Sequence, residues 1–201
     1  MNLPNSLTIT RIFLVPFLVV VLLTKFEGRL IFGVRKELVG AAIFLLASLT
    51  DWLDGYLARR RRQVTILGQM MDPVADKLLT SAALVSLVQM NLAPAWMVAI
   101  VIGREFAVTG LRSIAYARGI TIPASPLGKI KMVAQVIAIL LLILGQEHLQ
   151  GLAVLGQIAL WVVVITAVAS AADYYRRFTR LPARVAEFPA VPARMGRTKV
   201  G

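Results

Sequence analysis

The sequence contains no cysteine, which excludes disulfide bonds, thiolate chemistry and cysteine-ligated zinc sites. It has a single histidine, His148, in a predicted turn where we expect a solvated surface residue. The first eleven residues are too polar for a cleavable signal peptide and lead into an apolar run without an A-x-A cleavage site. These absences leave carboxylates and basic side chains as the chemistry-bearing groups.

Acidic residues are scarce, because 10 Asp and Glu stand against 22 Lys and Arg and give a net charge of +12. Much of the basic excess lies beside apolar runs. The positive-inside rule and attraction to anionic headgroups account for most of it, so membrane lipids and not nucleic acid are the expected partner.

Hydrophobic residues make up 58% of the chain, and several apolar runs are long enough to cross roughly 30 Å of hydrocarbon. A soluble domain of this size could not bury so much apolar surface. The sequence therefore predicts an all-α integral membrane protein, in which helices satisfy the backbone polar groups within the bilayer.

Six spanning helices are predicted, preceded by a short interfacial segment over residues 1–11, whose alternative interpretation is a helix start capped by Asn5 or Ser6. The predicted spans are residues 12–25 (extended back to residue 7 for length), 37–59, 70–90, 95–118, 127–144 and 152–175. They form one six-helix transmembrane domain over residues 1–176, followed by a basic tail over residues 177–201 that is rich in Pro, Ala and Arg and is expected to be disordered.

The basic residues also predict the orientation. The N-terminus, the arginine block at residues 59–62, the segment 118–131 and the tail are placed on the cytoplasmic side. The turns at residues 91–94 and 145–150, which lack Lys and Arg, then lie outside. The connection at residues 25–36 carries four basic residues and opposes this assignment, but the other loops outnumber it.

Residues 51–76, DWLDGYLARRRRQVTILGQMMDPVAD, place four aspartates between two apolar runs. Each carboxylate in a membrane costs roughly 2.5–3.5 kcal/mol, so four cost roughly 10 kcal/mol unless a partner compensates. Asp51 and Asp54 are three residues apart, and Asp72 and Asp76 are four apart, so each pair lies on one face of its helix. Such a set favours one or two Mg²⁺ or Mn²⁺ ions, which could bridge a diphosphate.

This stretch resembles the complete motif of the CDP-alcohol phosphotransferase family: D-x-x-D-G-x-x-A-R, eight residues, then G-x-x-x-D-x-x-x-D. The resemblance implies an enzyme that displaces CMP from a CDP-linked lipid by attack of an alcohol, with two bound ions. It assigns all four aspartates as metal ligands and Asp76 also as the base. Gly55, Ala58 and Gly68 would allow close approach of the nucleotide, and Arg59 would face the diphosphate.

Simpler interpretations exist for several of these residues. The aspartates could line an ion pathway, although a pathway does not need glycine and alanine at these offsets. Gly55 could ease helix packing, and the arginines at 60–62 could set topology alone. Asn5 and Thr8 could line the nucleotide site or serve in helix capping.

Basic residues also gather near the cytoplasmic ends of the fourth and fifth predicted spans, where a phosphate on the acceptor alcohol would be an economical partner. Arg112 and Lys129 are the first candidates for binding it. Further candidates are Arg104, Arg118 and Lys131. Glu105 could instead pair with Arg104 or Arg112 as a structural contact.

Three segments, PNSLT with Arg11, GREF with Arg112, and GKIK with Gln135, resemble those of bacterial phosphatidylglycerophosphate synthases. Met132 departs from the threonine common after GKxK. The resemblance implies transfer of a phosphatidyl group from CDP-diacylglycerol to sn-glycerol 3-phosphate, giving phosphatidylglycerophosphate and CMP. It further implies a homodimer in the bacterial cytoplasmic membrane, with the active site facing the cytoplasm.

Other functions remain open at this point. A member of the same family could use inositol phosphate, serine or phosphatidylglycerol as acceptor. An intramembrane prenyltransferase also uses paired aspartates and magnesium, but would be expected to have more spans and lacks the glycine, alanine and arginine pattern. A cation transporter or a small scaffold protein is the non-enzymatic alternative.

Overall fold

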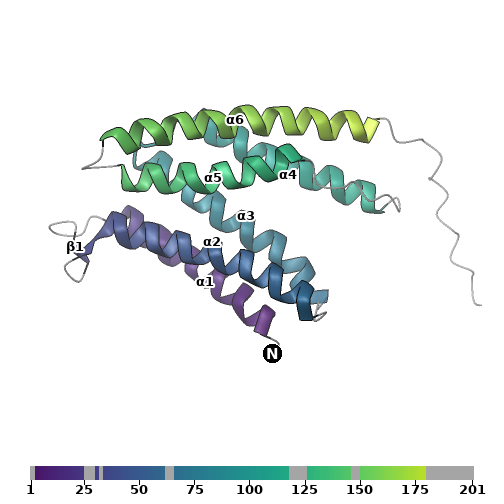
Figure 1. Cartoon of the computed structure of the whole chain (residues 1–201), viewed down its shortest axis with the longest axis horizontal. Helices are drawn as coiled ribbons and strands as arrows, with labels where there is room; N and C mark the ends of the chain where they lie inside the picture. The colour runs from purple at the N-terminus through teal and green to yellow at the C-terminus, as the bar shows by residue number, and fades with distance from the viewer. Residues whose placement is uncertain are drawn as a thin grey trace, which may run out of the picture.

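The computed structural model describes residues 3–24, 30–31, 34–61, 66–117, 126–145 and 150–179. The described chain is built from six helices and a minimal two-stranded pairing (Figure 1). The helices are α1 (Leu3–Leu23), α2 (Lys36–Arg61), α3 (Ile66–Gln89), α4 (Ala95–Ala117), α5 (Pro126–Leu144) and α6 (Gln150–Thr179). The prediction of an all-α fold with six helices in this order is confirmed.

The first helix differs from its prediction. α1 begins at Leu3 and continues without interruption to Leu23, past Pro16. The expected interfacial segment is therefore the first part of the same helix, and Asn5 and Ser6 lie inside it instead of capping its start. The helix start was predicted too late because polar residues are also compatible with helical backbone.

The connection between the second and third helices is also shorter than expected. α3 begins at Ile66, so Gly68 lies in its first turn and not in a loop. Before α2, strands β1 (Leu30–Ile31) and β2 (Val34–Arg35) pair antiparallel, with Leu30 opposite Arg35. This small hairpin was not predicted and adds only two residues in each strand.

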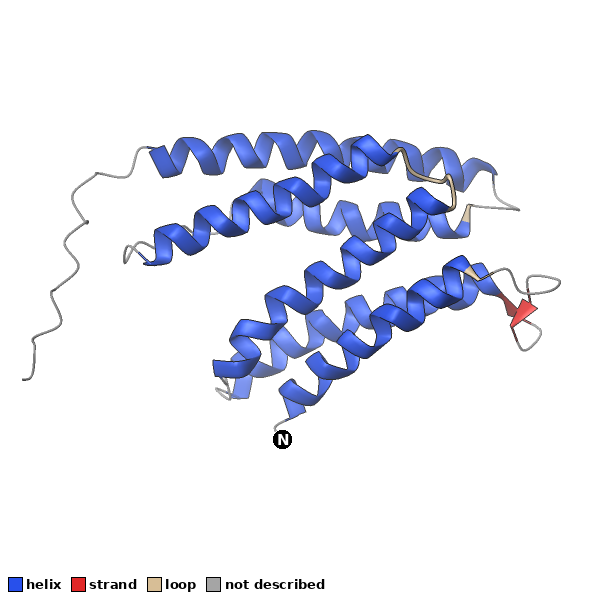
Figure 2. Ribbon diagram, turned by 180° about the vertical axis from the view of Figure 1, so that it is seen from behind, coloured by secondary structure: helices blue, strands red, loops and turns tan. Residues whose placement is uncertain are grey.

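The helices form two groups of three, one with α1, α2 and α3 and the other with α4, α5 and α6 (Figure 2). α1 packs on α2 and α3, and α6 packs on α4 and α5. The two groups meet where α2 and α3 contact α5 and α3 contacts α4. The buried core includes Leu18, Phe44, Leu87, Met97 and Ile139, which come from five helices and hold the groups together.

The turn between α3 and α4 confirms the predicted turn at residues 91–94. Asn91 has a φ of 59°, the left-handed conformation common just after a helix end. The amide of Leu92 donates to the carbonyl of Leu87 at 2.9 Å, which closes the turn. Gln157 Nε2 on α6 donates to Leu92 O at 2.6 Å and ties the turn to the last helix.

The backbones of α5 and α6 come close because small residues lie at their contact. A Cβ added to Gly156 would lie 2.9 Å from Leu142 Cδ2 and 3.0 Å from its amide nitrogen. At Gly145, after the end of α5, an added Cβ would lie 2.5 Å from Ala153 N. Close approach at glycine is the packing mode of helices within membranes, where dispersion and not water exclusion drives association.

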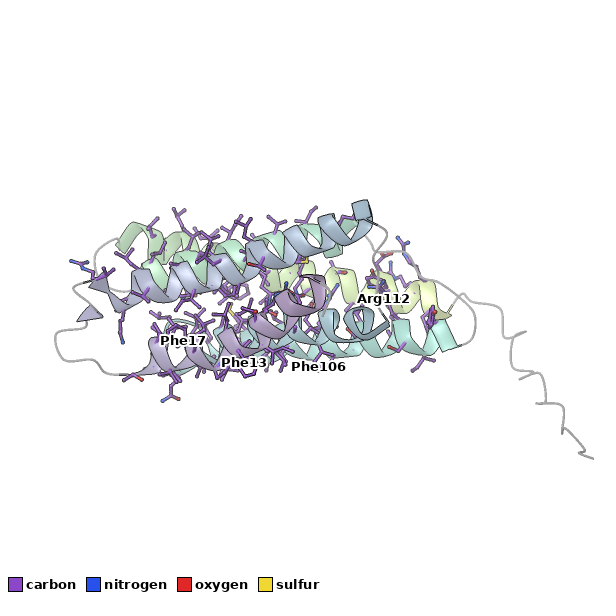
Figure 3. The ribbon with its side chains drawn as sticks, turned by 90° about the horizontal axis from the view of Figure 1, so that it is seen from below. Phe13, Phe17, Phe106 and Arg112 are labelled. Carbon is purple, nitrogen blue, oxygen red and sulfur yellow. The ribbon has the colours of Figure 1, made fainter. Side chains whose placement is uncertain are left out.

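Large apolar side chains remain on the outside of the molecule. Phe13 is 73% exposed, Phe17 53% and Phe106 61%, and all three project from their helices in Figure 3. In the described chain, Gly151–Thr179 of α6 is the one stretch long and apolar enough to cross a membrane by length and composition, and Thr10–Leu23 is a shorter apolar stretch. α4 is a continuous helix, but Arg104, Glu105 and Arg112 interrupt its apolar sequence.

Candidate active site

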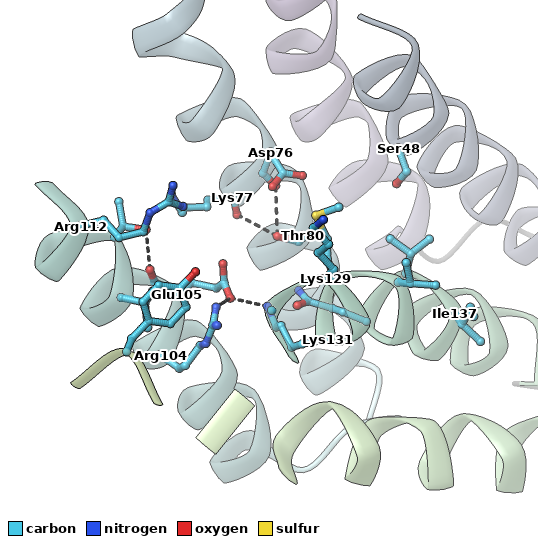
Figure 4. A pocket seen from close by; sticks show the side chains of 18 of the residues that line it. Ser48, Asp76, Lys77, Thr80, Arg104, Glu105, Arg112, Lys129, Lys131 and Ile137 are labelled. Carbon is cyan, nitrogen blue, oxygen red and sulfur yellow. Dashed lines mark hydrogen bonds and ion pairs between the residues drawn. The ribbon is translucent and has the colours of Figure 1, made fainter. Parts of the chain in front are cut away.

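A cavity of about 620 Å³ lies where the two helix groups meet (Figure 4). α2, α3, α4 and α5 supply most of its lining, and α6 contributes Tyr174. Its polar part includes Asp76 with the cations Arg104, Arg112, Lys129 and Lys131. The structure therefore brings the last aspartate of the central motif together with four of the five predicted phosphate-binding cations.

Asp76 is half-buried on α3, and its carboxylate is drawn at the cavity in Figure 4. One turn later, Thr80 Oγ1 donates to the backbone carbonyl of Asp76 at 3.1 Å. Since the helix fixes the backbone on both sides, the carboxylate has a defined position at the wall.

The remaining motif residues lie on α2 and α3, on predicted helices except for Gly68, which was predicted in a loop. α2 carries Asp51, Asp54, Gly55, Ala58 and Arg59, and α3 carries Gly68 and Asp72. Their side chains lie outside the described part of the structure, as do those of Asn5 and Thr8 on α1. Among the described side chains no group of three acidic or histidine residues forms, since only Asp76 of the four aspartates belongs to them.

The four predicted phosphate-binding cations that the structure describes divide into two kinds. Arg112 and Lys129 are exposed at the cavity, and no ion pair joins either of them to another described residue. Arg104 and Lys131 are instead buried, with side chains 10% and 4% exposed. Arg118, the fifth predicted cation, lies outside the described residues.

Glu105 connects the two buried cations. Its Oε1 accepts a hydrogen bond from Arg104 Nη1 at 2.7 Å and forms an ion pair with Lys131 Nζ. Arg104 Nη2 also donates to Ser170 Oγ on α6 at 2.6 Å. The suggested pairing of Glu105 with Arg104 is thus present, while its second partner is Lys131 and not Arg112.

Sequence reasoning missed several lining residues. Ser48 precedes Asp51 by three positions, and Thr80 follows Asp76 by four, so helical spacing from the motif could have found both. Tyr174 of α6 is far from the motif in the sequence, and no local signal points to it. Ser48 Oγ and Arg104 Nε are buried without a hydrogen-bond partner in the described chain, so a bound ligand could satisfy them.

The geometry agrees with the sequence comparison. Residues 1–169 match the family described as CDP-alcohol phosphatidyltransferase, which is most of the chain. The chain belongs to the CDP-alcohol phosphatidyltransferase family. The cavity thus includes the last aspartate of the central motif of a CDP-alcohol phosphatidyltransferase.

Individual relatives of this CDP-alcohol phosphatidyltransferase are named more narrowly. A Bacillus subtilis (strain 168) protein named CDP-diacylglycerol–glycerol-3-phosphate 3-phosphatidyltransferase is 46% identical over 182 residues, covering 88% of this chain and 94% of its own length. A Rickettsia typhi protein of the same name is 37% identical over 177 residues, covering 87% and 96%. A Mycobacterium tuberculosis (strain H37Rv) protein named probable phosphatidylglycerophosphate synthase is 38% identical over 182 residues, covering 89% and 82%.

Proposed function

We propose that the protein transfers the phosphatidyl group of CDP-diacylglycerol to sn-glycerol 3-phosphate, releasing CMP and forming phosphatidylglycerophosphate. The relatives that cover 88% and 87% of this chain carry the name of this activity. The observation that carries the proposal is the cavity, because it presents a motif aspartate, several cations and an apolar wall to one space.

The apolar wall suits the lipid substrate. It is formed by α2 and α5, and its members are Leu45, Leu49, Met132, Val133, Val136 and Ile137. Most of these side chains are exposed, so the wall continues onto the apolar outer surface of the helices. A lipid bound with its headgroup at Asp76 could leave its acyl chains along this wall without burying them among charges.

The cationic part of the cavity suits the acceptor. Arg112 and Lys129 supply exposed donors on neighbouring walls, which matches a phosphate monoester carrying close to two negative charges. Serine carries no phosphate and would leave these donors without a partner. The cations therefore favour a phosphorylated alcohol such as glycerol 3-phosphate.

Two divalent ions, Mg²⁺ or Mn²⁺, are proposed as cofactors. The candidate ligands are all carboxylates on two consecutive helices, a donor set that hard cations prefer: Asp51, Asp54, Asp72 and Asp76. Asp76 lines the cavity, and Asp72 lies one helical turn before it. When bound, such ions would neutralise negative charge on the diphosphate and on the departing CMP.

The protein residues would supply binding, orientation and proton transfer. Arg112 and Lys129 would hold the acceptor phosphate, so that the glycerol 1-hydroxyl reaches Asp76. The Asp76 carboxylate would accept the proton of that hydroxyl as its oxygen attacks the phosphorus that bears the diacylglycerol. The bond between that phosphorus and the bridging oxygen of the diphosphate breaks, and CMP leaves with this oxygen. Gly55, Ala58, Gly68 and Arg59 remain the proposed nucleotide and diphosphate contacts.

The proposal includes a membrane location. The helices have 19 to 30 residues and therefore run roughly 28–45 Å, so the shortest about matches a hydrocarbon core of roughly 30 Å and the longer ones can cross it with some tilt. The exposed phenylalanines described above support lipid contact along these helices. We infer six spans in the bacterial cytoplasmic membrane, a cavity facing the cytoplasm, and a homodimer.

An acceptor screen tests the proposed function. Purified protein in detergent micelles would be given CDP-diacylglycerol and Mg²⁺ or Mn²⁺, and CMP release would be measured with glycerol 3-phosphate, inositol phosphate, serine or phosphatidylglycerol as acceptor. We expect release with glycerol 3-phosphate, its loss on adding EDTA and its recovery with excess Mg²⁺. Release with another acceptor alone would assign a different substrate, and no release with any acceptor would rule out the enzyme.

A further inference from the structure

The Glu105 network links three helices at the cavity wall. Glu105 and Arg104 lie on α4, Lys131 lies on α5, and Ser170 lies on α6. One carboxylate oxygen, Oε1, contacts both cations. Figure 4 shows Glu105 between Arg104 and Lys131, on the side of the cavity away from Asp76. Each of these three charged residues lines the cavity.

Arg104 and Lys131 need the ion pairs and hydrogen bonds of this network because their charged side chains are largely buried. The Lys131 side chain is 4% exposed and that of Arg104 10%, so water solvates neither charge well. A buried charge is strongly unfavourable unless an opposite charge and hydrogen bonds compensate it. Without Glu105, two like charges would face each other across α4 and α5, and their side chains would rearrange.

We infer that Glu105 is a positioning residue for the acceptor phosphate. It holds Arg104 and Lys131 at a fixed separation in the wall, and Ser170 fixes the other end of the Arg104 guanidinium. The acceptor phosphate contacts the exposed cations Arg112 and Lys129 directly and is oriented by this fixed pair behind them. The inference rests on the proposed function, because it concerns the acceptor of that same reaction.

Two roles for Glu105 predict opposite effects. If Glu105 served only as a counter-charge, its removal would leave more unpaired positive charge and would strengthen phosphate binding. If it positions the cations, its removal disorders the binding wall and weakens phosphate binding despite the added positive charge. The sign of the change in KM for glycerol 3-phosphate therefore separates the two roles.

The test compares Glu105→Gln and Glu105→Asp with wild type in CMP release. For Glu105→Gln we expect the KM for glycerol 3-phosphate to rise about tenfold or more, with less than about twofold change in the KM for CDP-diacylglycerol. Glu105→Asp keeps the charge but shortens the reach, so we expect an intermediate KM. A lower KM for glycerol 3-phosphate, or equal effects on both substrates, would overturn the inference.

Ser170→Ala provides a second route should Glu105→Gln fail to fold. It removes one hydrogen bond of Arg104 without changing any charge, and we expect the KM for glycerol 3-phosphate to rise about threefold. Ser86→Ala is the matched control, because Ser86 is a buried helical serine that bonds to Ala82 O and does not line the cavity. An unchanged KM in Ser170→Ala would contradict the positioning role.

The wild-type measurement distinguishes a failure of the proposed function from a failure of the role inferred for Glu105. If wild type releases no CMP with glycerol 3-phosphate, the proposed function fails. If wild type uses glycerol 3-phosphate and the variants show no selective rise in its KM, only the role of Glu105 fails.

Discussion

Arg104 on α4 donates a hydrogen bond to Ser170 on α6, and the two atoms, Nη2 and Oγ, lie 2.6 Å apart. This bond joins a charged wall of the cavity to α6, the one helix in the described chain with a stretch long and apolar enough to cross a membrane by length and composition. It also distinguishes Arg104, which the protein holds internally, from Arg112, which remains exposed to a ligand. The predictions below use this division between structural and ligand-facing side chains.

Replacing Asp76 by Asn tests the proposed base. The amide keeps the size of the side chain but cannot accept the hydroxyl proton, so we expect kcat to fall by roughly 10²–10⁴-fold. Initial rates of CMP release give kcat, and thermal unfolding in detergent shows whether the fold is retained. A folded variant with activity near wild type would exclude Asp76 as the base.

Replacing Arg112 by Ala tests the acceptor site. Loss of a charge-assisted hydrogen bond of roughly 1.5–3 kcal/mol should raise the KM for glycerol 3-phosphate by about 10- to 100-fold. The KM for CDP-diacylglycerol should change far less. Arg35→Ala is the control, since Arg35 is exposed on β2 and does not line the cavity. The opposite order of effects would place Arg112 at the nucleotide.

Replacing Leu49 by Gln tests the apolar wall. Leu49 lines the cavity and is 52% exposed, and a polar amide there would disfavour an acyl chain. We expect a several-fold rise in the KM for CDP-diacylglycerol and little change for glycerol 3-phosphate. Leu38→Gln on the same helix is the matched control, because Leu38 is 51% exposed and lies away from the cavity. Similar effects in both variants would show that the wall does not bind the lipid.

Replacing Gly145 by Ala tests the close contact between α5 and α6. The new Cβ would lie 2.5 Å from Ala153 N and 2.7 Å from its Cα, and backbone atoms cannot move aside cheaply. We expect a loss of about 1–3 kcal/mol in the free energy of unfolding, seen as a lower melting temperature. Gly151→Ala should be neutral or slightly stabilising, because nothing lies within 4 Å of its added Cβ. Equal melting temperatures would show that the contact relaxes.

The sequence predicted the helices well because each contains a run rich in apolar residues, and turn-forming or polar residues separate these runs. The turn after α3 was found because Asn91 and Pro94 interrupt the apolar pattern. Helix starts were predicted less well. The polar residues at the start of α1 and residues 66–69 at the start of α3 were assigned to an interfacial segment and a loop, although both stretches begin helices.

For the site, spacing alone led to Asp76 and to a hard-cation ligand set, because helical periodicity relates residues close in sequence. Basic residues on α4 and α5 could be predicted as candidates from their number and place. Their division into paired and exposed cations could not, since it depends on contacts between helices. The partner of Lys131 is 26 positions away, and Arg104 reaches Ser170 across 66 positions.

The two groups of three helices meet mainly where the cavity lies, so a substrate in it would touch both groups at once. Such a molecule acts as a crosslink that must be released before the groups can separate. A ligand present at about 100 times its Kd would add about 2.7 kcal/mol to the free energy of unfolding. A bound substrate should therefore raise the melting temperature of the protein in detergent, because it holds the two groups of helices together.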